Sequence, residues 1–476
     1  MPRPSVCRPP HWLALGAGLA VGGLAAPALA KPHLTPYAGA EVTLTDNIDL
    51  APRDRRESAV VFTEFGGLSL RETNRHTNYA LDGRLNLDTT VGNGTDVSLR
   101  PDVTGTGRVE LVEGRLYVDG RLLSQRELID ARGRIGSSPT VGRGNQTSVT
   151  TVAVSPFLTG HIGPYADTEL RYTHEDTLVD ARDVGNSMTN ALSWRTTSGR
   201  ALPRLRLTGT LEYSATRASP SEDNLDRETA LLSGEYAVTR QVFLIGSAGW
   251  ERIASPGLSY TRNGLIGLGG FRYRPSPRLE LELTAGQRYG GPTYNGHLSY
   301  LVTSRWTAGV NYAETLETPQ TRLGRPANRI TLDPQTGGLV VSDTRNLGIP
   351  RSASVVGTLR FDLKGRYTVD DVDLWFTRET RDYDVGPDET IVTSGAQWRH
   401  RLSERLALSA QAQYRHVATA GPEGDSDTAI GTASLVYTVF RDVTGSVSLS
   451  RSQRFSSRPE QRYTENTILF GLMARF

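Results

Sequence analysis

Apolar and polar residues alternate with a period of two along most of this chain. In one run, Leu279, Leu281 and Leu283 occupy one set of alternate positions, and Glu280 and Glu282 occupy the other. Successive side chains of a β-strand point to opposite faces, so this pattern predicts a strand with one apolar and one polar face. About 22 such runs of roughly 10 to 15 residues follow one another, the length that tilted strands need to cross a bilayer. Boundary errors leave the strand number between roughly 18 and 22.

The connections between these runs alternate between short and long. Gly163-Pro164 and Arg441-Asp442 are examples of the tight turns. The longer connections are polar and rich in Gly, Pro and Asp, and they cover residues 45–56, 129–147, 177–186, 216–226, 316–351, 381–389, 418–427 and 456–462. Short periplasmic turns and longer extracellular loops are typical of outer-membrane barrels, and an even strand number places both termini in the periplasm. The longest connection, 316–351, either folds inward as a constriction or reaches outward to a partner.

The start of the chain predicts export from the cytoplasm. Arg3 and Arg8 precede an apolar run at 12–26, and the small-residue triplet 28–30 follows that run. This is the pattern of a Sec-type signal peptide over residues 1–30, with cleavage near Ala30, and it leaves residues 31–476 as the mature protein. Beyond residue 30 no apolar stretch reaches the length of a membrane-spanning helix, and the mean hydropathy is −0.37. Any membrane insertion is therefore expected to use strands.

The end of the chain is an alternating strand whose last residue is aromatic. Gly471 and Phe476 have the spacing of the C-terminal signal by which the barrel assembly machinery recognises its substrates. Because lipid cannot hydrogen-bond to an open sheet edge, a membrane-spanning sheet must close on itself. The sequence therefore predicts an all-β fold, a single large antiparallel transmembrane β-barrel in the cell outer membrane, surrounded by outer-membrane lipid.

The polar face of each strand is expected to line the lumen. A barrel of about 22 strands is wide enough for an aqueous channel or a plugged lumen. By position in the alternating pattern, the candidate lumen-lining residues are Asp82, Arg84, Asp119, Arg121, Asp167, Glu169, Arg171, Glu280, Glu282, Arg360, Asp362, Gln411, Gln413 and Arg415. Their mixed charges favour neither anions nor cations.

Composition and motifs limit the binding partners and catalytic functions that the sequence supports. The 53 basic and 51 acidic residues give a net charge of only +2, which gives no support to a nucleic-acid partner. Nucleotide-binding, serine-hydrolase and zinc-protease motifs do not occur, so we expect no cofactor and no metal. His174, Glu175 and Asp176, with His416, form the one candidate cluster for an active site at the outer rim, and a solvated rim is the competing interpretation. We expect the protein not to be an enzyme.

Several segments resemble a known family. The segment Glu41–Pro52, with the sequence EVTLTDNIDLAP, is similar to the N-terminal motif of the outer-membrane β-barrels associated with the PEP-CTERM sorting system. Further similar segments are Val109–Asp119, Ser155–Leu158 followed by Gly163–Tyr172, Tyr273–Arg278 and Gly286–Gly290. The resemblance implies a barrel encoded beside exopolysaccharide genes, and it implies no catalytic residues.

The wide barrel and this resemblance together suggest a function. The leading hypothesis is a non-enzymatic channel or scaffold that assists exopolysaccharide export or surface anchoring, with polysaccharide or export-system proteins as partners. One alternative is a general diffusion porin for small solutes, and another is an outer-membrane enzyme with an active site at the rim. The sequence leaves the oligomeric state open.

Overall fold

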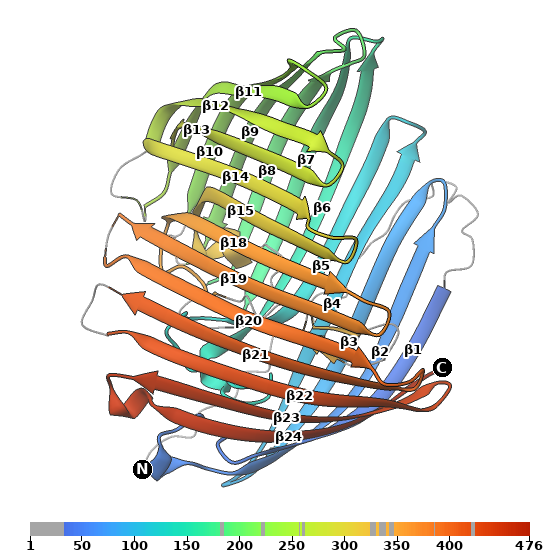
Figure 1. Cartoon of the computed structure of the whole chain (residues 1–476), viewed down its shortest axis with the longest axis vertical. Coiled ribbons are helices and arrows are strands. Elements are labelled where there is room, and N and C mark those ends of the chain that lie inside the picture. The colour runs from blue at the N-terminus through green and yellow to red at the C-terminus, as the bar shows by residue number, and fades with distance from the viewer. Residues whose placement is uncertain are drawn as a thin grey trace, which may run out of the picture.

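The computed structural model describes residues 33–476, except 181–184, 220–223, 257, 259–261, 324–329, 333–338, 342–346, 385 and 420–423. Twenty-two strands form one antiparallel sheet, and β1 pairs with β24, so the sheet closes into a barrel. In Figure 1 the strands run around the wall from blue through green and yellow to red. The predicted all-β barrel is therefore confirmed. The signal peptide expected at 1–30 lies outside the described residues.

The strands of the first half of the wall are β1 (His33–Thr45), β2 (Ala59–Thr73), β3 (Thr77–Val91), β4 (Thr95–Val112), β5 (Leu116–Leu128), β6 (Gln146–Ile162), β7 (Ala166–Val179), β8 (Ser187–Ser198), β9 (Leu205–Ala218), β10 (Leu225–Ala237) and β11 (Val242–Ala254). Those of the second half are β12 (Arg262–Ser276), β13 (Leu279–Arg288), β14 (Gly291–Leu301), β15 (Trp306–Glu317), β18 (Ser354–Arg366), β19 (Asp370–Tyr383), β20 (Glu389–Arg401), β21 (Leu406–Thr419), β22 (Ser426–Phe440), β23 (Val443–Ser456) and β24 (Tyr463–Arg475). The elements that do not belong to the wall are helix α1 (Pro319–Leu323), a small pair of strands, β16 (Ile330–Leu332) and β17 (Leu339–Val341), and the 3-10 turns Arg53–Arg55, Arg143–Asn145 and Pro459–Gln461.

The outer face of the wall is apolar. Leu99, Leu265 and Phe440 are 65%, 79% and 70% exposed there, whereas inward residues such as Thr43 are buried. Exposed apolar side chains are stable in contact with lipid hydrocarbon, which explains why alternation along each strand is sufficient to specify the two faces. Within the described residues, no helix is long and apolar enough to cross a membrane.

The barrel closes where its first and last strands meet. Tyr37 of β1 lies opposite Arg475 of β24, and Phe476 donates its backbone N–H to the Pro36 carbonyl at 2.9 Å. The two ends of the described chain therefore lie side by side at the rim that carries the short turns. That this rim faces the periplasm stays a prediction. Phe476 is 76% exposed on the outer face, and the role of Gly471 and Phe476 in assembly also stays a prediction.

The strand ladder is interrupted between β4 and β5. Their pairing begins only at Val103 and Ser124, although β4 starts at Thr95 and β5 continues to Leu128. Residues 125–128 stay paired with β6. The end of β5 therefore separates from β4 and carries the following segment into the lumen.

Candidate functional site

Residues 129–145, here called the first inner segment, lie inside the barrel. The Ile135 backbone N–H donates to the Tyr463 hydroxyl at 3.1 Å, and the Ser137 hydroxyl donates to Glu465 at 2.8 Å. From β23, Arg454 donates to the Gly133 carbonyl at 2.7 Å. The expectation of an outer loop at 129–147 is therefore wrong. The physical reason is that inward polar side chains of β23 and β24 supply the hydrogen bonds that this backbone needs away from water.

A second inner segment enters from the connection between β15 and β18. Besides β16 and β17, its described parts are residues 318–323, which include α1, and residues 347–353. Leu323 and Ile349 pack against Val149 of β6. Leu347 packs in a different cluster, against β20 and β21. The segment thus spans the lumen between distant parts of the wall, and of the two possibilities for 316–351 the described parts take the inward one.

The two inner segments contact each other and together form what we call the plug. Ile349 donates its backbone N–H to the Ile129 carbonyl at 3.2 Å. Gly348 has a φ of +80°, and a Cβ there would lie 2.5 Å from the backbone nitrogen of Ala131. Only glycine fits this left-handed, closely approached position. The plug lies at the level of the long-loop rim, because its partners lie near the ends of the wall strands there.

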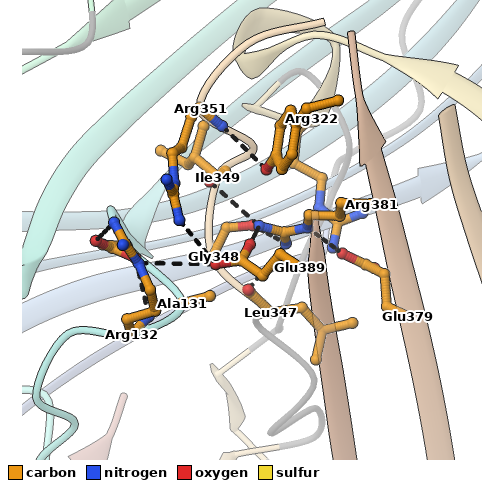
Figure 2. Close-up of polar contacts among 12 residues, drawn as sticks. Ala131, Arg132, Arg322, Leu347, Gly348, Ile349, Arg351, Glu379, Arg381 and Glu389 are labelled. Carbon is orange, nitrogen blue, oxygen red and sulfur yellow. Dashed lines mark hydrogen bonds and ion pairs between the residues drawn. The ribbon is translucent and has the colours of Figure 1, made fainter. Parts of the chain in front are cut away.

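One buried arginine of the wall holds the second inner segment in place (Figure 2). Arg381 of β19 has no exposed surface, and it donates from Nε to Glu379 at 2.7 Å and from Nη1 to Glu389 at 3.0 Å. Its Nη2 donates to the carbonyl oxygens of Leu347 at 2.9 Å and Gly348 at 2.8 Å. Hydrogen bonds from a charged donor are stronger than neutral ones, so this side chain fixes the backbone of the plug to the wall.

Helix α1 extends the same set of charges. Arg322 lies 2.8 Å from Glu317 and 2.8 Å from Glu379. Burial favours the neutral form of Arg322, but the two carboxylates outweigh burial and raise its pKa above the ordinary value. Arg322 therefore stays charged at any physiological pH and ties α1 to β15 and β19.

The first inner segment joins this network on the other side of Arg381. Arg132 approaches Glu389 at 3.7 Å and donates to Asp130 at 3.0 and 2.8 Å. Burial would raise the pKa of Asp130, but the hydrogen bonds from Arg132 outweigh it and lower the pKa. The Arg415 guanidinium of β21 donates to the carbonyls of both segments, at Ala131 and Leu347. Opposite charges and carbonyl acceptors thus join both inner segments to one patch of wall.

A cavity of about 380 Å³ lies between the plug and the wall. It is lined by residues 135–140 of the first inner segment and by β1–β6 and β20–β24. Its reach to Gln397 and Ala407 shows that it extends from the plug toward the short-turn rim. A volume of this size is within the range of small-molecule sites.

The structure separates the predicted lumen residues into two groups. Arg84, Gln411, Gln413 and Arg415 line the cavity. The others form ion pairs along the wall: Asp82 with Arg71, Asp119 with Arg108 and Arg171, Arg121 with Glu175, Asp167 with His161, Glu169 with Arg171, Glu280 with Arg274, Glu282 with Arg272, and Arg360 with Asp362. Mutual pairing of neighbouring strands therefore accounts for most of the charges that were predicted from the alternation.

Sequence reasoning missed the residues that hold the plug. Glu379 and Arg381 continue the inward positions of β19, but Arg381 and Glu389 were placed in a loop at 381–389. The available signal was the run of polar residues at every second position from Thr377 to Arg381, which continues the two-residue period of the strand. No pattern in the sequence pointed to the backbone carbonyls that Arg381 binds.

The candidate rim cluster does not converge. His174 and Asp176 contact each other at 3.3 Å on the outer face, whereas Glu175 points inward and pairs with Arg121. Adjacent strand residues face opposite sides of the wall, which separates these groups. His416 is paired with Asp427 on the outer face of β21 and β22, at 2.8 Å.

The pair of Arg84 and Glu41 provides a test of burial in the wall. Their side chains are 7% and 12% exposed and 2.8 Å apart, and the guanidinium lies 3.6 Å from the ring centre of Phe65. Arg84→Met leaves Glu41 without its partner, so we expect a loss of about 3–5 kcal/mol in unfolding free energy, measured by urea titration. The matched control is Arg71→Met, whose pair with Asp82 is exposed and whose loss should cost at most about 1 kcal/mol. Equal losses in the two variants would contradict this assignment.

No family model matches the chain, and no curated protein matches it. Among solved structures, it is similar to the siderophore receptor PirA from Acinetobacter baumannii, with a TM-score of 0.50, 9% identity, and coverage of 93% of this chain and 80% of that one. The ferric enterobactin receptor PfeA from Pseudomonas aeruginosa has a TM-score of 0.48 and 11% identity, with coverage of 93% of this chain and 80% of that one. The ferric-catecholate import receptor Fiu from E. coli K12 has a TM-score of 0.48 and 10% identity, with coverage of 92% of this chain and 81% of that one. At these identities the likeness shows the fold alone. The resemblance to the PEP-CTERM-associated barrels stays a prediction.

These findings correct the expected function. The similar structures are named as receptors for siderophores and ferric compounds, and none of those reported above is named as a polysaccharide exporter or a porin. The plug also contradicts an open diffusion porin, because both inner segments cross the lumen. Export or anchoring of exopolysaccharide, general diffusion and rim catalysis are therefore wrong as functions. The chain is a 22-strand outer-membrane β-barrel, and two of its own connections enter the lumen and bind to the inner side of the wall.

Proposed function

We propose that this protein is a gated uptake receptor, which admits a small solute through the outer membrane only when the plug moves. The plug is the observation that carries the proposal: two segments cross the lumen, contact each other, and are held by charged side chains of the wall. Barrels of 22 strands in the outer membrane serve as transporters with a plugged lumen.

The arrangement has the two parts that gating needs. The polar contacts of the plug with Arg381, Arg415 and Arg454 keep the lumen closed at rest. The cavity next to the plug offers a polar site on the path toward the short-turn rim. A solute that binds more tightly to the open state than to the closed state would shift the equilibrium toward passage.

Planar-bilayer recording of the refolded full chain tests the proposal. We expect the unmodified protein to be closed without solute, and to open or to transport when a recognised solute is added. Ferric siderophores are the first ligands to test, because receptors of this fold are named for them. A large, steady conductance of the unmodified protein in plain salt solution would overturn the proposal, since it would mean that the plug does not block the lumen.

A further inference from the structure

Among the residues that the structure describes, no carboxylate pairs with Arg126, an arginine that lines the cavity. Arg126 lies near the end of β5, and its Nη1 donates to the Pro139 carbonyl at 2.8 Å. Because β5 has separated from β4 at this level, Arg126 faces the inner wall of β3 and β4. Its other N–H donors remain available to a ligand, since a guanidinium carries five.

The carboxylates nearest to Arg126 already have partners. Asp88 accepts from Arg100 at 3.1 Å and from the Thr63 hydroxyl at 2.7 Å. Asp102 accepts from Asn86 at 2.9 Å and pairs with Arg100. Arg126 therefore adds a positive charge that its surroundings do not match, in a cavity lined by five arginines and three acidic residues.

The opposite side of the cavity carries little charge and is rich in hydrogen-bonding groups. Serine, threonine and glutamine side chains of β21–β23 line it, among them Ser409, Gln411, Thr432, Ser434, Ser446 and Ser448. Of the lining residues that β21–β24 contribute, Arg415 alone is charged. Hydroxyl and amide groups both donate and accept, so this wall suits a ligand that carries several hydroxyls.

We propose that the cavity binds a small polyhydroxylated carboxylate, with its carboxylate on Arg126 and its hydroxyls along β21–β23. The assignment rests on the proposed uptake function and names the class of solute. Arginine binds carboxylates through two parallel hydrogen bonds, which fixes the orientation of the ligand as well as holding its charge. The hydroxyl-lined strands then lead the bound solute from the plug toward the short-turn rim.

Calorimetric titration of the full chain in detergent with gluconate tests this site. Sorbitol has the same hydroxyl chain without the carboxylate, and acetate has the carboxylate without the hydroxyls. We expect saturable binding of gluconate, at least ~10-fold weaker binding of either comparison compound, and a loss of about 10- to 100-fold in Arg126→Gln. Arg126→Lys should retain part of the affinity, because it keeps the charge but loses the two-pronged geometry.

Arg171→Gln is the matched control, because Arg171 also lies in the lumen but pairs with Asp119 and Glu169 and does not line the cavity. Its gluconate affinity should equal that of the unmodified protein. Equal binding of gluconate to Arg126→Gln, equal binding of acetate, or no saturable binding would each overturn the site. Heat-dependent gel mobility shows whether each variant has assembled. An open pore in bilayers would refute gating, whereas the titration refutes only the site, so the two failures are distinguishable.

Discussion

Arg381→Met is expected to turn a closed barrel into a conducting one. The substitution removes the donor to the Leu347 and Gly348 carbonyls and leaves Glu379 and Glu389 facing each other without the intervening positive charge. Removing one partner of a buried ion pair costs about 3–5 kcal/mol. Because each 1.4 kcal/mol changes an equilibrium constant tenfold, the plug should open at least about 100-fold more often.

Single-channel recording in planar bilayers measures this change as open probability. The control is Arg360→Met, because Arg360 is also a lumen arginine, but it pairs with Asp362 within β18 rather than with the described residues of the plug. It should remain as closed as the unmodified protein. If Arg381→Met assembles into a barrel and stays silent, Arg381 does not hold the plug, and the closed state must depend on other contacts.

A disulfide between the first inner segment and the wall is expected to lock the plug. The Ser137 and Thr467 hydroxyl oxygens lie 3.3 Å apart, which suits replacement of both residues by cysteine. The chain has one natural cysteine, Cys7, within the predicted signal peptide. A native-like disulfide stabilises by about 2–4 kcal/mol, so the oxidised Ser137→Cys/Thr467→Cys variant should open at least ~10-fold less often than the unmodified protein in urea that leaves the barrel folded.

Reduction provides the internal comparison for the locked variant. Adding dithiothreitol during the recording should restore opening to the level of the unmodified protein. Ser434→Cys/Ser448→Cys is the control, because these hydroxyls are 2.8 Å apart on β22 and β23 and a disulfide there joins wall to wall. If the oxidised plug variant opens as often as this control, then passage does not require movement of the first inner segment.

The wall could be predicted from the sequence because lipid on one side and water on the other impose a strict alternation. The alternating run of Leu279, Leu281 and Leu283 lies in β13, Leu279–Arg288, and the alternating end of the chain forms β24. The rim cluster could have been resolved in the same way, since neighbours such as His174 and Glu175 must point to opposite faces. Local pattern was sufficient wherever the environment of a residue followed from its position along a strand.

The plug could not be predicted, because its contacts are not local. The segment 129–147 has the Gly, Ser and Arg content of an outer loop, and nothing in its own sequence distinguishes inside from outside. Its position depends on partners such as Tyr463 and Glu465, which are 328 positions away from Ile135 and Ser137 in the chain. The unmatched Arg126 was hidden for a related reason, because the separation of β5 from β4 reverses the face that its place in the strand would predict.

This separation along the chain has a consequence for how the barrel is made. The first inner segment is synthesised long before β23 and β24, whose side chains hold it. Contacts between such distant positions form late, because the intervening chain must first be ordered. A barrel that is still growing has the contacts of this segment with β3 and β4, through Arg143, but lacks those with β23 and β24, which form only as the last strands join. A barrel whose assembly stalls at this stage should leak small molecules. Closure of the wall therefore also protects the permeability barrier of the outer membrane.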